Sequence, residues 1–207
     1  MTRKSRRRLI VLASCVLLAG GILLLLSGAR ELIWPWWHQK QAAKVWPPPA
    51  PKAPAPSLPS PPKTLDHSLF HRGDTVAKLT IPRLGGEWYI VEGTEESTLR
   101  LGPGHMTGTA FPGEKGNCVI AGHRDTQFRK LKDIHKGDEI VLKTSIGETR
   151  YKVTGWEIVK PTNTASLQDT PNAVLNLITC YPFYYVGNAP NRFIVHAEMA
   201  GPEVAGQ

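Results

Sequence analysis

The sequence predicts an all-β domain that follows an apolar N-terminal helix and a proline-rich segment. Residues 9–29 carry no charged side chain, and residues 47–62 contain nine prolines. From residue 76 onward, short runs rich in β-branched and aromatic residues are separated by Gly, Pro, Asn or Asp, which is typical of strands joined by turns. With 207 residues the chain has room for one well-packed domain but not comfortably for two.

The N-terminal leader has the pattern of a membrane anchor. Five basic residues lie within residues 1–8 and precede the uncharged run 9–29, which is long enough to span a bilayer as a helix. Basic residues stay on the cytoplasmic side, so residues 1–8 are predicted to be a cytoplasmic tip and the rest of the chain to lie outside. A cleaved signal peptide is the alternative, because Ser27, Gly28 and Ala29 resemble a cleavage site.

Residues 30–65 are predicted to form a linker rich in Trp and Pro. Its Trp34, Trp36 and Trp37 have the placement of an aromatic belt at the membrane interface. The nine prolines that follow favour an extended, semi-rigid spacer and cannot form a packed core. The folded domain is then expected over residues 66–199, with a short tail at 200–207.

The distribution of charge argues against a nucleic-acid-binding domain. Residues 1–63 hold ten Lys and Arg and one acidic residue, Glu31. Residues 64–207 therefore hold 25 − 10 = 15 basic residues against 17 − 1 = 16 acidic ones. The excess positive charge belongs to the leader, whereas nucleic-acid binding needs a basic patch on the folded unit.

Within the domain, seven segments have the composition of strands and only two short segments have helical spacing. The helical segments are residues 96–102 and 126–134. Seven or eight strands with little helix indicate a barrel or a sandwich. The predicted strands cover residues 76–82, 87–93, 116–122, 138–144, 149–159, 173–179 and 191–199.

Three cysteines have different sequence environments. Cys15 lies in the predicted membrane span, and Cys118 lies inside a strand where alternation would bury it. Cys180 directly follows a predicted strand. Outside the cytoplasm, a structural Cys118–Cys180 disulfide is a serious alternative to a reactive thiol.

Two other reactive side chains are expected at the same edge of the sheet as Cys180. His123 comes directly after the strand at 116–122, and Arg192 begins the last strand. If residues 181–190 connect two antiparallel strands, Cys180 and Arg192 are neighbours. A thiol beside a cation and a histidine is suited to thiolate chemistry.

The residues alone leave other interpretations open. By alternation, Ile178 shares the face of Cys180, whereas Thr179 faces the other way.

His105, expected in a glycine-flanked loop near the same rim, competes with His123 as the functional histidine. A Cys118–His123–Cys180 metal site lacks the paired spacing of zinc sites, and no metal or cofactor is predicted.

Three motifs in order resemble the sortases, the cysteine transpeptidases of bacterial cell surfaces. They are "NCVIAGHRDTQFRKL" (117–131), "LNLITCYPF" (175–183) and "APNRFIV" (189–195). The second is similar to the Thr-Leu-Val-Thr-Cys-Tyr-Pro-Phe type of class D, with Asn176 in place of the first Thr. The likeness covers residues 74–199, and "GPGHMTGTAFPGEKGN" (102–117) has the same character.

The resemblance implies an eight-stranded sortase-type β-barrel with short helices. It also implies that Cys180 is the nucleophile, His123 the general acid and base, and Arg192 the positive group of the site. Ile178 and Thr179, next to the nucleophile, are expected to bind substrate.

The implied reaction cleaves a Leu-Pro-x-Thr-type sorting signal of an exported protein through a thioacyl-enzyme. The acyl group then passes to an amine of a peptidoglycan precursor or cross-bridge, or to a pilin lysine. The protein would be single-pass in the bacterial cytoplasmic membrane, and no nucleic acid is an expected partner. A tethered binding domain with a Cys118–Cys180 disulfide is the alternative.

A second family of cell-wall cysteine enzymes does not fit. In the L,D-transpeptidases, His lies two residues before the Cys and Arg two residues after it. Here His123 precedes Cys180 by 57 residues and Arg192 follows it by twelve.

Overall fold

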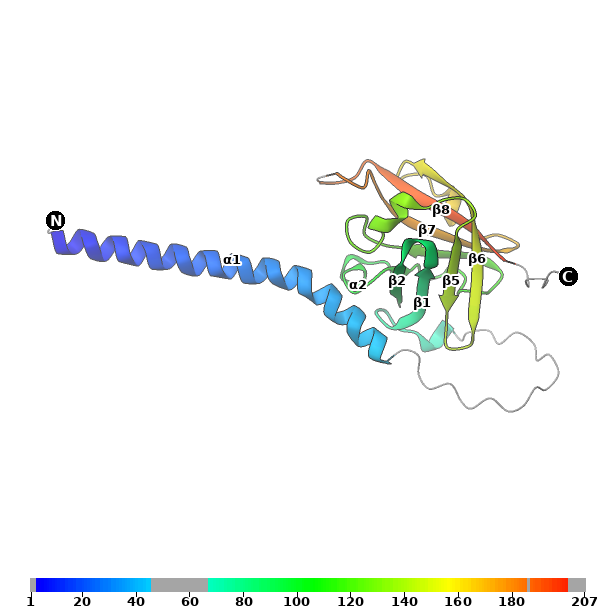
Figure 1. The fold of residues 1–207 in the computed structure, drawn as a ribbon, viewed down its shortest axis with the longest axis horizontal. Coiled ribbons are helices and arrows are strands. Elements are labelled where there is room, and N and C mark those ends of the chain that lie inside the picture. The colour runs from blue at the N-terminus through cyan, green and yellow to red at the C-terminus, as the bar shows by residue number, and fades with distance from the viewer. Residues whose placement is uncertain (1–2, 46–66, 186, 201–207) are drawn as a thin grey trace. The chain divides into compact units, whose positions relative to one another are not determined.

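The computed structural model describes residues 3–45, 67–185 and 187–200 (Figure 1). Residues 1–38 and residues 39–207 form two compact units. The N-terminal element α1 (Arg3–Val45) is a helix of 43 residues. Within the described residues, however, no helix is both long and apolar enough to cross a membrane, which differs from the anchor predicted at residues 9–29.

The helix α1 also extends beyond the predicted anchor. It continues through residues 30–45, which the sequence assigned to a linker. Residues 39–43 (Gln-Lys-Gln-Ala-Ala) are good helix formers, which accounts for the continuation. The nine-proline stretch and the predicted tail from residue 201 onward lie outside the described residues.

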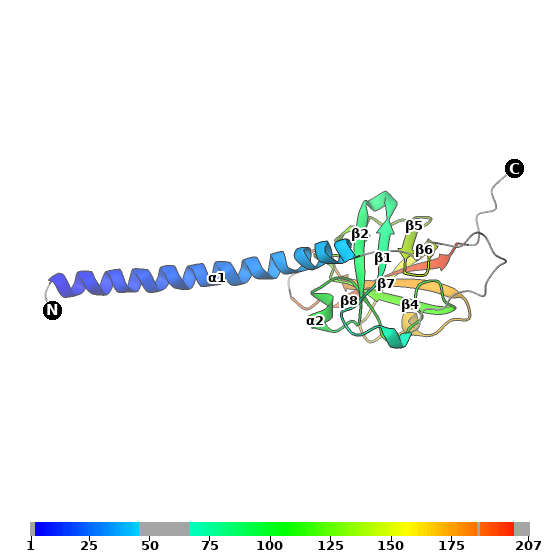
Figure 2. The same ribbon diagram turned by 90° about the horizontal axis from the view of Figure 1, so that it is seen from below.

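The second unit contains a closed barrel of eight strands (Figure 2). Around the barrel the order is β1-β2-β3-β4-β7-β8-β6-β5. The pairs β2–β3 and β4–β7 are parallel, and the other neighbours with a described register are antiparallel. The strands are β1 (Thr75–Ile81), β2 (Gly86–Glu92), β3 (Gly104–His105), β4 (Gly116–Ala121), β5 (Glu139–Lys143), β6 (Glu148–Val159), β7 (Ala173–Tyr181) and β8 (Asn191–Met199).

All seven predicted strands are confirmed, and β3 is the strand that the sequence did not indicate. It has only two residues, too few for alternation to be visible. Gly104 pairs with Val91 of β2 and with Ala121 of β4. A Cβ atom at Gly104 would lie 2.0 Å from the carbonyl oxygen of Gly93, so this narrow strand requires glycine.

The inside of the barrel is filled by alternate side chains of the strands. In β7, Leu175, Leu177 and Thr179 are buried, as alternation predicts. Phe128 and Leu131 add apolar volume from the connection between β4 and β5, and both are fully buried.

The helices of the barrel unit are short. The helix predicted at 96–102 is α2 (Glu96–Leu99), and the one predicted at 126–134 is a 3₁₀ helix at Arg129–Asp133. The 3₁₀ form follows from its bonds between residues three apart, such as Leu131 N–H to Phe128 O at 3.0 Å. The other 3₁₀ helices are His67–Leu69, Pro82–Leu84 and Ala165–Leu167.

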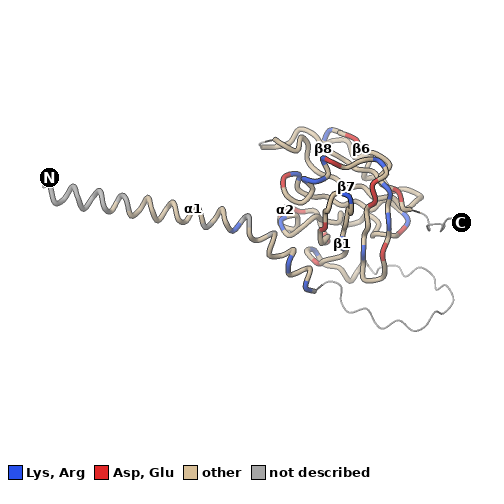
Figure 3. The backbone as a smooth tube through the Cα atoms, viewed as in Figure 1, with Lys and Arg blue, Asp and Glu red and all other residues tan. Residues whose placement is uncertain are grey.

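Charges of both signs are interspersed over the barrel (Figure 3). Two ion pairs of this unit, Lys78–Glu87 and Arg150–Glu139, join neighbouring strands at 2.9 and 2.8 Å. This arrangement agrees with the nearly neutral composition of residues 64–207.

Candidate active site

Strand register places Cys180 directly opposite Arg192. The two residues are paired in the antiparallel ladder between β7 and β8, which lie side by side in Figure 1. Cα atoms of opposed residues in such a ladder are about 4.5–5.5 Å apart. On its other side, Arg192 is paired with Val159 of β6. The predicted contact between the nucleophile candidate and the cation is therefore built into the sheet.

The parallel pair β4–β7 brings His123 to the same end of the sheet. The register ends with Ala121 opposite Ile178, and Gly122 N–H donates to Ile178 O at 3.0 Å. His123 follows Gly122 directly, so it lies just beyond the end of β4, on the side of the sheet where β7 ends. Thus three residues from three strand ends, far apart in sequence, converge at one edge of the barrel.

The burial of these side chains suits chemistry at a surface. Cys180, His123 and Arg192 are all half-buried, and the thiol of Cys180 is free. The Arg192 guanidinium donates to the carbonyl oxygen of Asn191 at 3.0 Å, and no carboxylate of the described residues forms an ion pair with it. Its positive charge is therefore available to a ligand.

Cys118 also has a free thiol but differs from Cys180 in its burial. It is 1 % exposed, and burial raises the pKa of its thiol well above the ordinary range. It pairs with Leu175, which is five residues from Cys180, or about 16 Å along a strand. A disulfide needs Cα atoms within about 7 Å, so the Cys118–Cys180 alternative does not fit this fold.

The residues predicted to bind substrate lie on opposite faces of β7. Ile178 is half-buried on the outer face, the face of Cys180, and is paired with Ile194 of β8. Thr179 is 2 % exposed on the inner face. Its hydroxyl donates to Gly122 O at 2.7 Å, so the side chain ties β7 to the end of β4 and is not placed to contact a substrate.

His105 is not the loop residue that the sequence suggested. It lies in β3 and is 1 % exposed, with Nδ1 2.7 Å from Glu92 Oε2 and Nε2 donating to Ala110 O at 3.0 Å. Burial alone would raise the pKa of Glu92. Hydrogen bonds from His105 and Thr107 outweigh it and leave this pKa below its ordinary value. His105 therefore has a structural partner on each ring nitrogen.

The sequence did not reveal a polar network on the outer face, next to Ile178 and Ile194. Asn176 donates to Asn117 Oδ1 at 2.7 Å and to Ser166 O at 3.1 Å. His196 Nδ1 lies 2.6 Å from Asn176 Oδ1, and Ser166 donates to Glu157 at 2.9 Å. The network holds the connection between β6 and β7 against the sheet. Its signal in the sequence was an asparagine inside each of two apolar strands.

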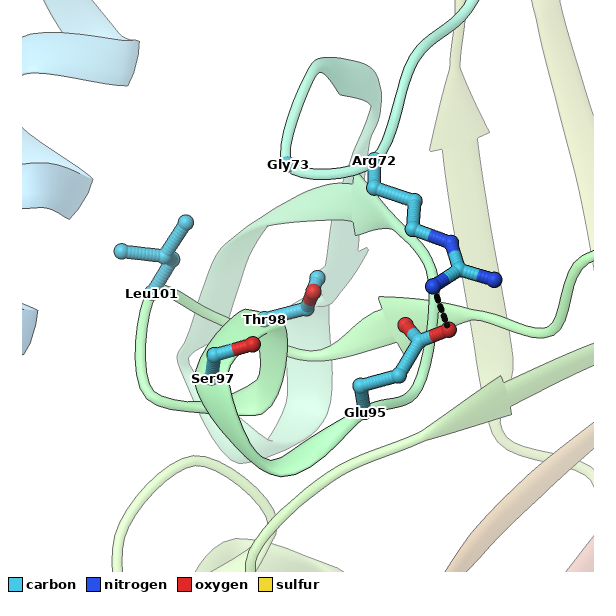
Figure 4. Close-up of a pocket in the computed structure, with 6 residues that line it drawn as sticks. All are labelled: Arg72, Gly73, Glu95, Ser97, Thr98 and Leu101. Atoms are coloured by element: carbon cyan, nitrogen blue, oxygen red, sulfur yellow. Dashed lines mark ion pairs between the residues drawn. The ribbon is translucent and has the colours of Figure 1, made fainter.

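A separate pocket of about 250 Å³ lies elsewhere on the barrel unit. One side is formed by the residues that precede β1, and the other side by residues in and around α2. An ion pair between Arg72 and Glu95 at 3.0 Å spans one side of it (Figure 4). Cys180, His123 and Arg192 are not among its lining residues. In the described part of the chain, no group of three His, Cys, Asp or Glu side chains is arranged to hold a metal ion.

Comparison with known proteins agrees with the geometry. The family model of the sortase domain matches residues 79–200. Sortase D of Bacillus subtilis (strain 168) is 41 % identical over 128 residues, which are 61 % of this chain and 64 % of that protein. The chain thus spans slightly less than two thirds of that relative's length.

Among solved structures, sortases also resemble this chain in fold and sequence. A sortase D5 transpeptidase of Clostridium perfringens is 30 % identical with a TM-score of 0.59, covering 64 % of this chain and 82 % of that one. Sortase C of Clostridium perfringens with the C-terminal cell wall sorting motif is 25 % identical with a TM-score of 0.60, covering 69 % and 80 %.

Proposed function

The chain belongs to the sortase family, whose domain matches more than half of its residues, and on that premise we propose that it is a cysteine transpeptidase with Cys180 as nucleophile. The observation that carries this proposal is the register of three strands. It pairs Cys180 with Arg192, and it ends β4 beside Ile178, two residues before His123.

In the proposed reaction, Cys180 Sγ attacks the carbonyl carbon of the scissile peptide bond and forms a thioester. His123 takes the thiol proton and passes a proton to the departing amine, and an incoming amine then attacks the thioester. His123 accepts the proton of that amine, and the thiol is regenerated. Splitting amide exchange into two acyl transfers lowers the barrier of each.

Arg192 is proposed to stabilise the oxygen that becomes negative in each tetrahedral intermediate. A fixed donor of this kind contributes about 3–4 kcal/mol in well-studied acyl-transfer sites. The support is its position opposite Cys180 and the absence of a competing carboxylate among the described residues.

The substrate is proposed to be an exported protein with a Leu-Pro-x-Thr-type sorting signal. Support comes from the family and from the similarity to the sortase C that was solved with a cell wall sorting motif. Ile178, half-buried on the face of Cys180, supplies apolar surface beside the thiol for such a peptide. The amine is proposed to come from a peptidoglycan precursor or cross-bridge, or from a pilin lysine.

Mass spectrometry can test this function. The protein would be incubated with a panel of Leu-Pro-x-Thr-type peptides, and the acylated residue would be identified after rapid quenching. We expect a mass increase on Cys180 that an added amine removes. Peptides that remain intact, or acylation of Cys118, would refute the proposal.

We also propose that residues 9–29 hold the enzyme at the bacterial cytoplasmic membrane with the barrel outside. The support is the sequence pattern, and the side chains of Leu23, Leu24 and Leu25 are each more than 70 % exposed on α1. Cell fractionation should find the full chain in the membrane pellet and a chain lacking residues 1–29 in the soluble fraction. An unchanged distribution would contradict the anchor.

A further inference from the structure

The chain leaves the sheet at His123, and its backbone there needs a new hydrogen-bond acceptor. Gly122 makes the last bond from β4 to β7, since its N–H donates to Ile178 O at 3.0 Å. The next N–H, that of His123, donates to Gln127 Oε1 at 2.8 Å. A partly buried N–H without an acceptor is costly, so this side chain replaces the strand partner that His123 lacks.

The other end of the Gln127 amide is also fixed. Its Nε2 donates to Leu99 O at 2.8 Å, at the end of α2. A carbonyl oxygen can only accept and the His123 N–H can only donate, so these two partners determine the orientation of the amide. Gln127 therefore connects the histidine to the segment between β2 and β3.

The backbone on both sides of the His123 Cα atom is held as well. Phe128 N–H donates to His123 O at 2.9 Å. A Cβ atom at Gly122 would lie 2.8 Å from the Phe128 ring, so the preceding residue packs tightly too. Gln127 supplies the remaining constraint, on the His123 N–H itself.

From this geometry we infer that Gln127 is a positioning residue, which sets the backbone of His123 so that the imidazole serves Cys180. The inference rests on the proposed function in assigning the proton transfers to His123. The new element is that the rate of these proton transfers depends on Gln127, a residue that touches neither the substrate nor the thiol.

Three variants of the full-length protein separate this role from packing. Gln127→Met has a similar length and volume but makes neither hydrogen bond. Gln127→Glu can still accept from His123 N–H but cannot donate to Leu99 O. Thr126→Val, at an exposed site in the same loop, is the matched control.

We expect Gln127→Met to lower kcat for peptide cleavage by about tenfold to a hundredfold, because a misplacement of about 1 Å has effects of that order. KM should stay unchanged, since the substrate face is intact. Gln127→Glu should lose less kcat than Gln127→Met, because it keeps the bond from His123 N–H. Thr126→Val should have the kcat of the parent. An unchanged kcat in Gln127→Met, or a loss confined to KM, would overturn the inference.

A second measurement does not depend on activity. Amide hydrogen exchange followed by NMR should show a protected His123 N–H in the parent and in Thr126→Val, and much faster exchange in Gln127→Met. Equal protection in all the variants would overturn the inference. A parent that cleaves no sorting peptide would refute the proposed function, and the exchange result would then decide the positioning role alone.

Discussion

Burial raises the pKa of the Cys118 thiol, and the carboxylates of Glu114 and Glu92 raise it further. Cys180 is half-buried at the strand end and faces a guanidinium across the ladder. Because the thiolate is the reactive form, the surroundings of Cys118 argue against it as the nucleophile, which we propose to be Cys180.

The first residue-scale prediction concerns the two cysteines. Cys180→Ala should abolish peptide cleavage and acyl-enzyme formation, whereas Cys118→Ala should keep the chemistry and lose only stability. Steady-state cleavage and intact-protein mass spectrometry check both. A folded Cys118→Ala variant without activity would show that the wrong thiol has been chosen.

The two histidines give the second prediction. His123→Ala should lose about 10²–10⁴-fold in kcat, the range that general acid–base catalysis contributes. His105→Gln should lose much less per folded molecule and mainly lower Tm, because His105 is buried against Glu92. Equal losses of kcat in two folded variants would contradict this division of roles.

The third prediction separates geometry from charge at Arg192. Lysine keeps the charge but not the planar fork of donors, so Arg192→Lys should reduce turnover steeply while Tm changes little. Arg192→Ala should be worse, yet its Cys180 should still react with iodoacetamide. Near-parental turnover in Arg192→Lys would mean that only the charge matters.

At the scale of elements, the network around Asn176 joins β4, β7 and β8 to the 3₁₀ helix at Ala165–Leu167. Asn176→Asp keeps the shape but loses both donated hydrogen bonds. We expect it to reduce the free energy of unfolding by about 1–3 kcal/mol, the usual cost of leaving buried polar groups unsatisfied. Urea unfolding would measure this, with the exposed Asn172→Asp as control. Equal stability of the two variants would contradict a structural role for the network.

Most strands could be predicted because their alternation reflects one buried face. The level of His123 was harder to infer, because it depends on a parallel pairing of β4 with β7 that local patterns do not encode. Strand β3 escaped detection because only two residues pair. His105 was misjudged because glycine neighbours suggested a loop, whereas its burial depends on Glu92, thirteen residues away.

At the scale of the whole barrel, two buried carboxylates join segments that are distant in sequence. Glu92 of β2 accepts a hydrogen bond from His105 of β3. This bond helps to hold the pKa of Glu92 below its ordinary value despite burial. Hydrogen bonds from Arg83 to Asp138, the residue just before β5, likewise lower the pKa of Asp138. Both carboxylates therefore couple the stability of the barrel to protonation.

The last prediction is an acid-sensitive fold whose sensitivity can be traced to Glu92. A carboxyl with a lower pKa in the folded than in the unfolded chain binds fewer protons when folded. Its stabilising contribution is therefore present above the unfolded pKa and is lost as the pH falls through the folded one. We expect Tm to fall as the pH is lowered below about 4.3, the ordinary pKa of Glu. Glu92→Gln should lower Tm at pH 7 and flatten this dependence, whereas the exposed Glu198→Gln should leave the curve unchanged. If calorimetry from pH 7 to pH 3 gave parallel Tm curves for Glu92→Gln and the parent, the ionised Glu92 would not be what stabilises the barrel.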